Sequence, residues 1–180
     1  MNPNPVSCWL ALALAACAGG VAAQTCPLDP SAPAGTALTI RSPGQAAQYL
    51  GAADLAALPQ TERVQRRTLC AVDAASQPAL EQSLRYSGVL LRDMLARVVP
   101  ADTNRAARTL VFEAVATDGY RAVFSWGEVF TSSAGDQVLI VSAQDGRPLG
   151  ADQGPLALRA LADLRPGPRH VRNLCGLAVR

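Results

Sequence analysis

Alternation of apolar and polar residues recurs along this chain, and it is the pattern of strands that bury one face. The clearest case is 110–116, where Leu110, Phe112 and Ala114 fall on one side. A turn signal, Asp118-Gly119, follows directly, so 120–124 is predicted to return as the partner strand. The other predicted strands are 37–41, 64–72, 84–86 (leading into a turn at Gly88), 138–143 and 171–179.

Helical periodicity is confined to short stretches. Apolar residues occur at helical spacing from Leu91 to Val98, with Met94 and Leu95 between them, and predict one buried helix face. A second short helix is expected over 52–58, because Pro59 disfavours its continuation. A third should begin at Ser125, where Ser and Glu have capping-box spacing, and run through residue 130.

Strands therefore outnumber helices, and they do not follow a regular strand–helix–strand rhythm. This arrangement predicts an α+β fold with a mixed β-sheet. The length fits one domain over 37–180, preceded by a Pro-rich flexible arm over 24–36.

The first residues have the pattern of an export signal. An apolar run over 9–18 is shorter than the roughly 20 residues that span a bilayer, and the small residues at 21–23 suit a cleavage site. The prediction is a signal peptide over 1–23 and a periplasmic or secreted protein. The alternative is a lipoprotein signal that ends before Cys17, which would anchor the mature chain to a membrane through a lipid.

Charge and cysteine content narrow the function classes. The formal net charge is only +2, so no nucleic-acid partner is expected. Cys26, Cys70 and Cys175 follow the predicted signal, and an odd number in an oxidising compartment implies one disulfide and one remaining thiol. A zinc site is not expected from a single His without a Cys-x-x-Cys motif, and a Ser hydrolase is not expected without a Gly-x-Ser-x-Gly elbow.

Three spaced phrases occur in the second half of the chain. They are Tyr86-Ser87-Gly88-Val89-Leu90-Leu91-Arg92-Asp93-Met94-Leu95, then Ala116-Thr117-Asp118-Gly119-Tyr120, then Asp145-Gly146-Arg147-Pro148-Leu149 with Gly154-Pro155 close behind. Together they resemble the molybdopterin-binding domain of sulfite-oxidase-like oxidoreductases over about 37–180. The resemblance implies that family's fold, a molybdopterin cofactor and, in an active enzyme, oxotransferase chemistry. It implies a small-molecule substrate, or a periplasmic redox or sensor protein as partner.

The resemblance also assigns a metal ligand. Cys70 stands some way before the Tyr86-Ser87-Gly88-Val89 phrase, where the family has its molybdenum-ligating cysteine. A soft thiolate suits that metal. The alternative for Cys70 is a buried thiol or half of a disulfide. If Cys70 is reserved for the cofactor, Cys26 and Cys175 are left to pair, with Cα atoms within about 7 Å of each other.

The cofactor contacts implied by the resemblance are Asp118, Tyr120, Gln153, Arg159 and Arg172. Asp118 would lie near the pterin edge, although a plain hairpin turn explains the same residues. Gln153 stands where the family has His, and Arg is missing at its usual spacing, with Arg159 displaced along the chain. Arg172 would replace the Lys of the family's Ser-Val-Lys-Trp phrase.

Two functions follow from these features. The first is an exported oxidoreductase of the molybdopterin class, which Cys70 favours. The second is a non-enzymatic module on the same fold that binds a small ligand or a protein, since a fold does not fix a function. The changes at Gln153 and at the missing Arg favour this second interpretation.

Overall fold

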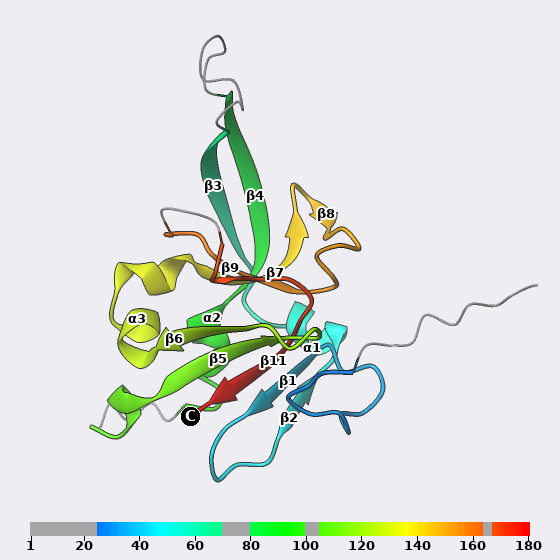
Figure 1. Cartoon of the computed structure of the whole chain (residues 1–180), viewed down its shortest axis with the longest axis vertical. Helices are drawn as coiled ribbons and strands as arrows, with labels where there is room; N and C mark the ends of the chain where they lie inside the picture. The colour runs from blue at the N-terminus through cyan, green and yellow to red at the C-terminus, as the bar shows by residue number, and fades with distance from the viewer. Residues whose placement is uncertain (1–24, 70–79, 100–104, 164–166) are drawn as a thin grey trace, which may run out of the picture.

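The computed structural model describes residues 25–69, 80–99, 105–163 and 167–180, and these residues form two β-sheets (Figure 1). Side chains from both sheets share one buried core. The first sheet has the strand order β2-β1-β11-β5-β6, and the second has the order β10-β9-β7-β4-β3 with β8 paired to β7. The bounds of the strands are β1 Leu38–Arg41, β2 Gln48–Leu50, β3 Thr61–Leu69, β4 Leu80–Leu90, β5 Val111–Ala116, β6 Arg121–Ser125, β7 Val138–Gln144, β8 Arg147–Pro148, β9 Ala157–Ala160, β10 His170–Val171 and β11 Leu174–Val179.

The first sheet confirms the predicted mixed sheet. β1 runs parallel to β11, whereas the pairs β1–β2, β11–β5 and β5–β6 are antiparallel. The β5–β6 hairpin is the one predicted from the sequence. Gly119 in its turn has a φ of +88°, a conformation that residues other than Gly rarely adopt.

The second sheet corrects one prediction. β4 does not stop at a turn near Gly88 but continues to Leu90 and pairs with β7 over Tyr86–Leu90. The register shifts at Gly88, and a Cβ there would collide with the backbone carbonyl of Ile140. Gly88 therefore permits a close approach of two strands at a bulge, which sequence patterns cannot distinguish from a turn. The parts of β3 and β4 that pair only with each other, 64–69 and 80–85, project from the body as a hairpin (Figure 1).

Short helices follow β2, β4 and β6: α1 Ala52–Ala56, α2 Leu91–Leu95 and α3 Trp126–Phe130. The 3-10 turns are at Ala107–Thr109 and Ser133–Gln137. The predicted face of α2 is buried, since Leu91, Met94 and Leu95 are fully enclosed in the core between the sheets. α3 begins as predicted, with the Ser125 hydroxyl accepting a hydrogen bond from the Glu128 amide at 3.2 Å.

The last predicted strand, 171–179, is divided into β10 and β11. Asn173 lies between them with a φ of +49°, so the chain turns there instead of continuing straight. Three short strands, β2, β8 and β9, were not predicted. Residues 70–72 of the predicted strand 64–72 lie outside the described residues, as do the predicted signal peptide and Cys17. Among the described helices, none has the length and apolar character needed to cross a membrane.

Candidate functional site

Three loops that contain residues singled out in the sequence meet at one end of the sheets: the turn after β5, the loop before β9 and the turn between β10 and β11. The Thr117 amide donates to the carbonyl of Asn173 at 3.0 Å, and the Asn173 amide donates to the carbonyl of Gln153 at 2.7 Å. Gly154 has a φ of +77°, and a Cβ on it would collide with the Asn173 side chain. The separate phrases around Asp118, Gly154 and Arg172 therefore belong to one structural unit, held together by backbone hydrogen bonds.

Asp118 and Tyr120 make local contacts within this unit. Oδ1 of Asp118 accepts a hydrogen bond from the amide of Tyr120 at 2.9 Å, which is the Asx-type contact of a turn. The Tyr120 hydroxyl donates to the carbonyl of Pro168 at 2.6 Å. These two residues thus shape the turn and fasten the segment that leads into β10.

Gln153, in the loop before β9, contacts Arg159 of β9. The contact lies on the face of the second sheet that is turned away from the shared core. The Arg159 side chain is only 7% exposed, its guanidinium donates to the side-chain oxygen of Gln153, and its central carbon lies 6.0 Å from the centre of the Tyr86 ring. Arg172 lies between β10 and β11 with its side chain exposed. The fold therefore joins Gln153 with Arg159 but does not add Arg172 to them through any described contact.

Cys70 lies outside the described residues. The preceding residue, Leu69, pairs with Leu80 at the far end of the β3–β4 hairpin, whereas β4 pairs with β7 only from Tyr86 onward. Within the described ranges, no three His, Cys, Asp or Glu side chains are grouped to hold a metal ion. Molybdenum ligation by Cys70 stays a prediction.

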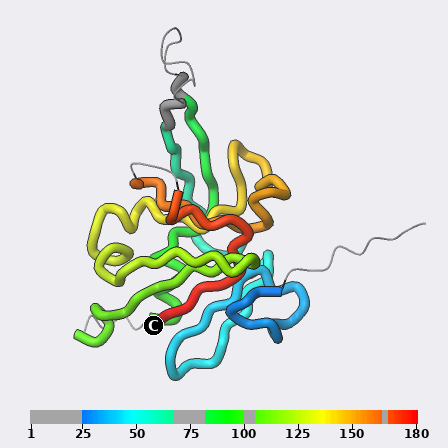
Figure 2. Tube along the Cα trace, in the orientation of Figure 1, coloured from blue at the N-terminus to red at the C-terminus, as the bar shows by residue number. Residues whose placement is uncertain are grey.

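The predicted disulfide between Cys26 and Cys175 is confirmed, with their Cα atoms 5.6 Å apart. It ties the segment 25–36, expected as a flexible arm, to β11. Gly176 makes this packing possible, because a Cβ there would lie 2.7 Å from a methyl carbon of Leu28. Figure 2 shows the segment (blue) folded back beside the first sheet.

A second anchor of this segment is Asp29, which is only 2% exposed. Its carboxylate forms an ion pair with Arg41 at 2.7 Å and accepts hydrogen bonds from the hydroxyls of Tyr49 and Ser31, each at 2.7 Å. The hydrogen bond from Arg41, with those from Ser31 and Tyr49, holds the pKa of Asp29 well below its usual range.

This lowered pKa predicts a pH-dependent stability. A carboxyl whose pKa is lower in the folded state stabilises the fold above its ordinary pKa, and this contribution is lost as the pH falls through the folded value. We expect Asp29→Asn to be less stable than wild type at neutral pH, with the difference shrinking below about pH 4. Urea unfolding of both proteins across this range checks the prediction, and a difference that stays constant down to low pH would contradict it.

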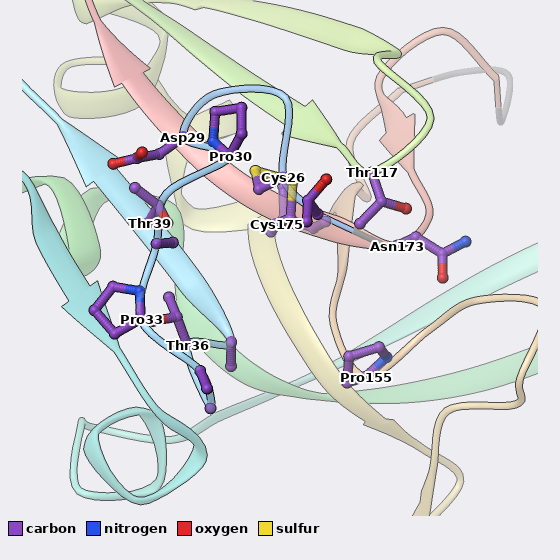
Figure 3. A pocket seen from close by; sticks show the side chains of 16 residues that line it. Cys26, Asp29, Pro30, Pro33, Thr36, Thr39, Thr117, Pro155, Asn173 and Cys175 are labelled. Carbon is purple, nitrogen blue, oxygen red and sulfur yellow. A yellow bond between two sulfur atoms is a disulfide. The ribbon is translucent and has the colours of Figure 1, made fainter. Parts of the chain in front are cut away.

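The anchored segment borders a half-open cavity of about 670 Å³ at the meeting point of the three loops (Figure 3). One side of the cavity is formed by Thr39 and by most residues of the segment 25–37. The other side is formed by Thr117, Pro155 and Asn173, with the Cys26–Cys175 disulfide between them. Sequence reasoning did not find Thr39, Asn173 or Pro155 as cavity residues. A signal was present in the Gly154-Pro155 pair and the Asn after Arg172, but it marked loops without showing that they meet.

The electrostatic character of the cavity follows from its wall. Among the described residues that line it, Asp29 is charged and none is Arg or Lys. Neither Arg159 nor Arg172 belongs to this lining. Asp29 is already paired with Arg41, so an anion placed in the cavity would find no free cation among these described residues of the wall, and burying an anion without one is costly.

Comparisons with known proteins place the fold. Residues 26–180 match the family model described as the oxidoreductase molybdopterin binding domain. The crystal structure of the sulfane dehydrogenase SoxCD from Paracoccus pantotrophus is similar, with a TM-score of 0.56 and 18% identity. The similarity covers 79% of this chain and 37% of that chain, so this chain spans little more than a third of that protein's length. A search of curated proteins finds no match. On the family match, this chain belongs to the oxidoreductase molybdopterin-binding domain family.

Proposed function

We propose that this protein is an exported, non-enzymatic binding module that holds a small ligand on the fold of a molybdopterin-binding domain. The observation that carries the proposal is the half-open cavity bordered by the disulfide-anchored segment. Its volume of about 670 Å³ suits a small molecule. The disulfide supports export, because such bonds persist in oxidising compartments.

The contacts of the described residues do not fit the phosphate end of molybdopterin. A buried phosphate needs a cation that can reach it. Arg159 instead stands against Tyr86 and Gln153 on the outer face of the second sheet, and Arg172 has an exposed side chain. The charged group at the cavity wall is the carboxylate of Asp29.

The oxotransferase function is the alternative. It requires Cys70 to ligate molybdenum as a thiolate, and it would use Gln153 and Arg159 as part of a cofactor site. The contact between these two side chains, together with the family match, is the observation that favours it. The two functions differ in one measurable property, which is the metal content of the protein.

Elemental analysis for molybdenum should separate them. Wild type and Cys70→Ser should be purified from a host that makes the molybdenum cofactor, beside an active enzyme of the sulfite-oxidase class that shows the host can load it. We expect molybdenum at background level in both variants. Molybdenum near one atom per chain in wild type, lost in Cys70→Ser, would instead establish the oxotransferase site and assign Cys70 as its ligand.

A further inference from the structure

The cavity beside the Cys26–Cys175 bond is the disulfide cavity. A second cavity, the α1 cavity, lies next to it. It has a volume of about 330 Å³ and lies between α1, β4 and β7. Its buried floor is aliphatic and is formed by Leu55, Val89, Ile140 and Leu156. Ala37 and Pro155 line both cavities, so the two cavities lie side by side with these residues common to both walls.

The two cavities differ in the groups they present to a ligand. The disulfide cavity has hydrogen-bonding side chains at its wall, among them Thr36, Thr117 and Asn173 (Figure 3). The α1 cavity is walled mostly by aliphatic side chains, which bind through burial of apolar surface. A molecule that filled both would need an apolar body and a polar end.

The charge of that ligand follows from Asp29. Its carboxylate already pairs with Arg41 and accepts from Tyr49 and Ser31, so its charge is compensated within the protein. The other described residues of both linings are uncharged. A charged ligand would lose its hydration without gaining a counter-ion, whereas a neutral one would lose much less.

Thr39 gives an independent observation at the cavity wall. Its side chain is fully buried on β1, and within the described part of the chain its hydroxyl has no hydrogen-bond partner. Buried hydroxyls are nearly always satisfied, so an unsatisfied one calls for a partner. A hydroxyl or carbonyl at the polar end of a ligand would supply it.

We propose that the two adjoining cavities together bind a neutral, elongated amphipathic small molecule. Its apolar body occupies the α1 cavity, and its hydrogen-bonding end lies in the disulfide cavity near Thr39. This inference names the ligand class of the binding module proposed above and rests on that proposal.

Displacement of a fluorescent probe tests the ligand class. The neutral probe N-phenyl-1-naphthylamine should bind saturably to the oxidised full chain. Decanol, decanoate and decylammonium share one tail and differ in the charge of the head group. We expect decanol to displace the probe at a concentration at least about tenfold lower than either ion, a difference of about 1.4 kcal/mol in binding free energy. Tighter binding of either ion would overturn the neutral-ligand claim.

Variants on α1 test where the apolar body lies. Ala56 lines the α1 cavity, whereas Ala53 is exposed on the same helix and does not belong to the lining described. Ala56→Trp should abolish probe binding, the milder Ala56→Leu should weaken it, and Ala53→Trp should leave it unchanged. Loss of binding in Ala53→Trp, or its retention in both Ala56 variants, would overturn the placement.

Thr39→Val tests where the polar end lies. The substitution removes the hydroxyl while keeping the shape of the side chain, so the protein should fold at least as well. We expect the affinity for decanol to fall about tenfold, the worth of one hydrogen bond, with probe affinity unchanged. Unchanged decanol affinity would overturn this contact. The molybdenum content of the protein tests the proposed function, and the displacement assays test the class of ligand. If one of the two claims is wrong, only its own measurement will show it.

Discussion

Replacing Cys26 and Cys175 together by Ser should lower the free energy of unfolding by about 2–5 kcal/mol. The bond joins residues 149 positions apart, so it restricts most of the unfolded chain. It also fixes Cys26 and Leu28 over Gly176, where no side chain fills the space. Urea unfolding of wild type and the double variant measures the loss.

Reducing agent provides the control for this prediction. Wild type in dithiothreitol should become as unstable as the double variant, and the double variant should not respond to the reductant. Equal unfolding free energies of wild type with and without reductant would contradict the structural role of the bond. The same samples should lose probe binding, because the disulfide holds one wall of the cavity.

Leu95→Ala should destabilise the fold by about 2–5 kcal/mol. Leu95 is fully buried on α2 and belongs to the core between the two sheets, beside Leu91 and Met94. Removal of its side chain leaves a cavity that two packed sheets cannot readily close. Denaturant melts of the variant measure the change in unfolding free energy.

Arg97→Ala is the matched control, because Arg97 follows the same helix and is exposed. Its effect should stay within about 0.5 kcal/mol. An equally small change in unfolding free energy for Leu95→Ala would show that this face of α2 does not contribute to the core.

The elements predicted correctly are those whose sequence signals lie within a few neighbouring residues. The β5–β6 hairpin followed from alternation around Asp118-Gly119, and α3 followed from the spacing of Ser125 and Glu128. Gly88 was misread as a turn, because its meaning depends on β7, which is distant in the sequence. The division at Asn173 was missed for a related reason, since apolar residues continue on both sides of it.

The candidate site depends even more on contacts between distant segments. The Cys26–Cys175 bond was predicted from the sequence, conditional on the role of Cys70, but nothing in the sequence indicated that the segment 25–36 would border a cavity. Arg159 and Gln153 were chosen from one phrase, and their contact was not predicted because the register of β9 was unknown. Thr39 was not noticed, because a Thr in a strand is ordinary until its hydroxyl is found unsatisfied.

Native mass spectrometry of the oxidised protein purified from the cells that make it tests the central claim most directly. The account predicts a chain free of molybdenum that carries a neutral small molecule, with this adduct absent from Ala56→Trp and present in Ala53→Trp. An adduct with the mass of a pterin phosphate and the isotope pattern of molybdenum, lost in Cys70→Ser, would contradict the account.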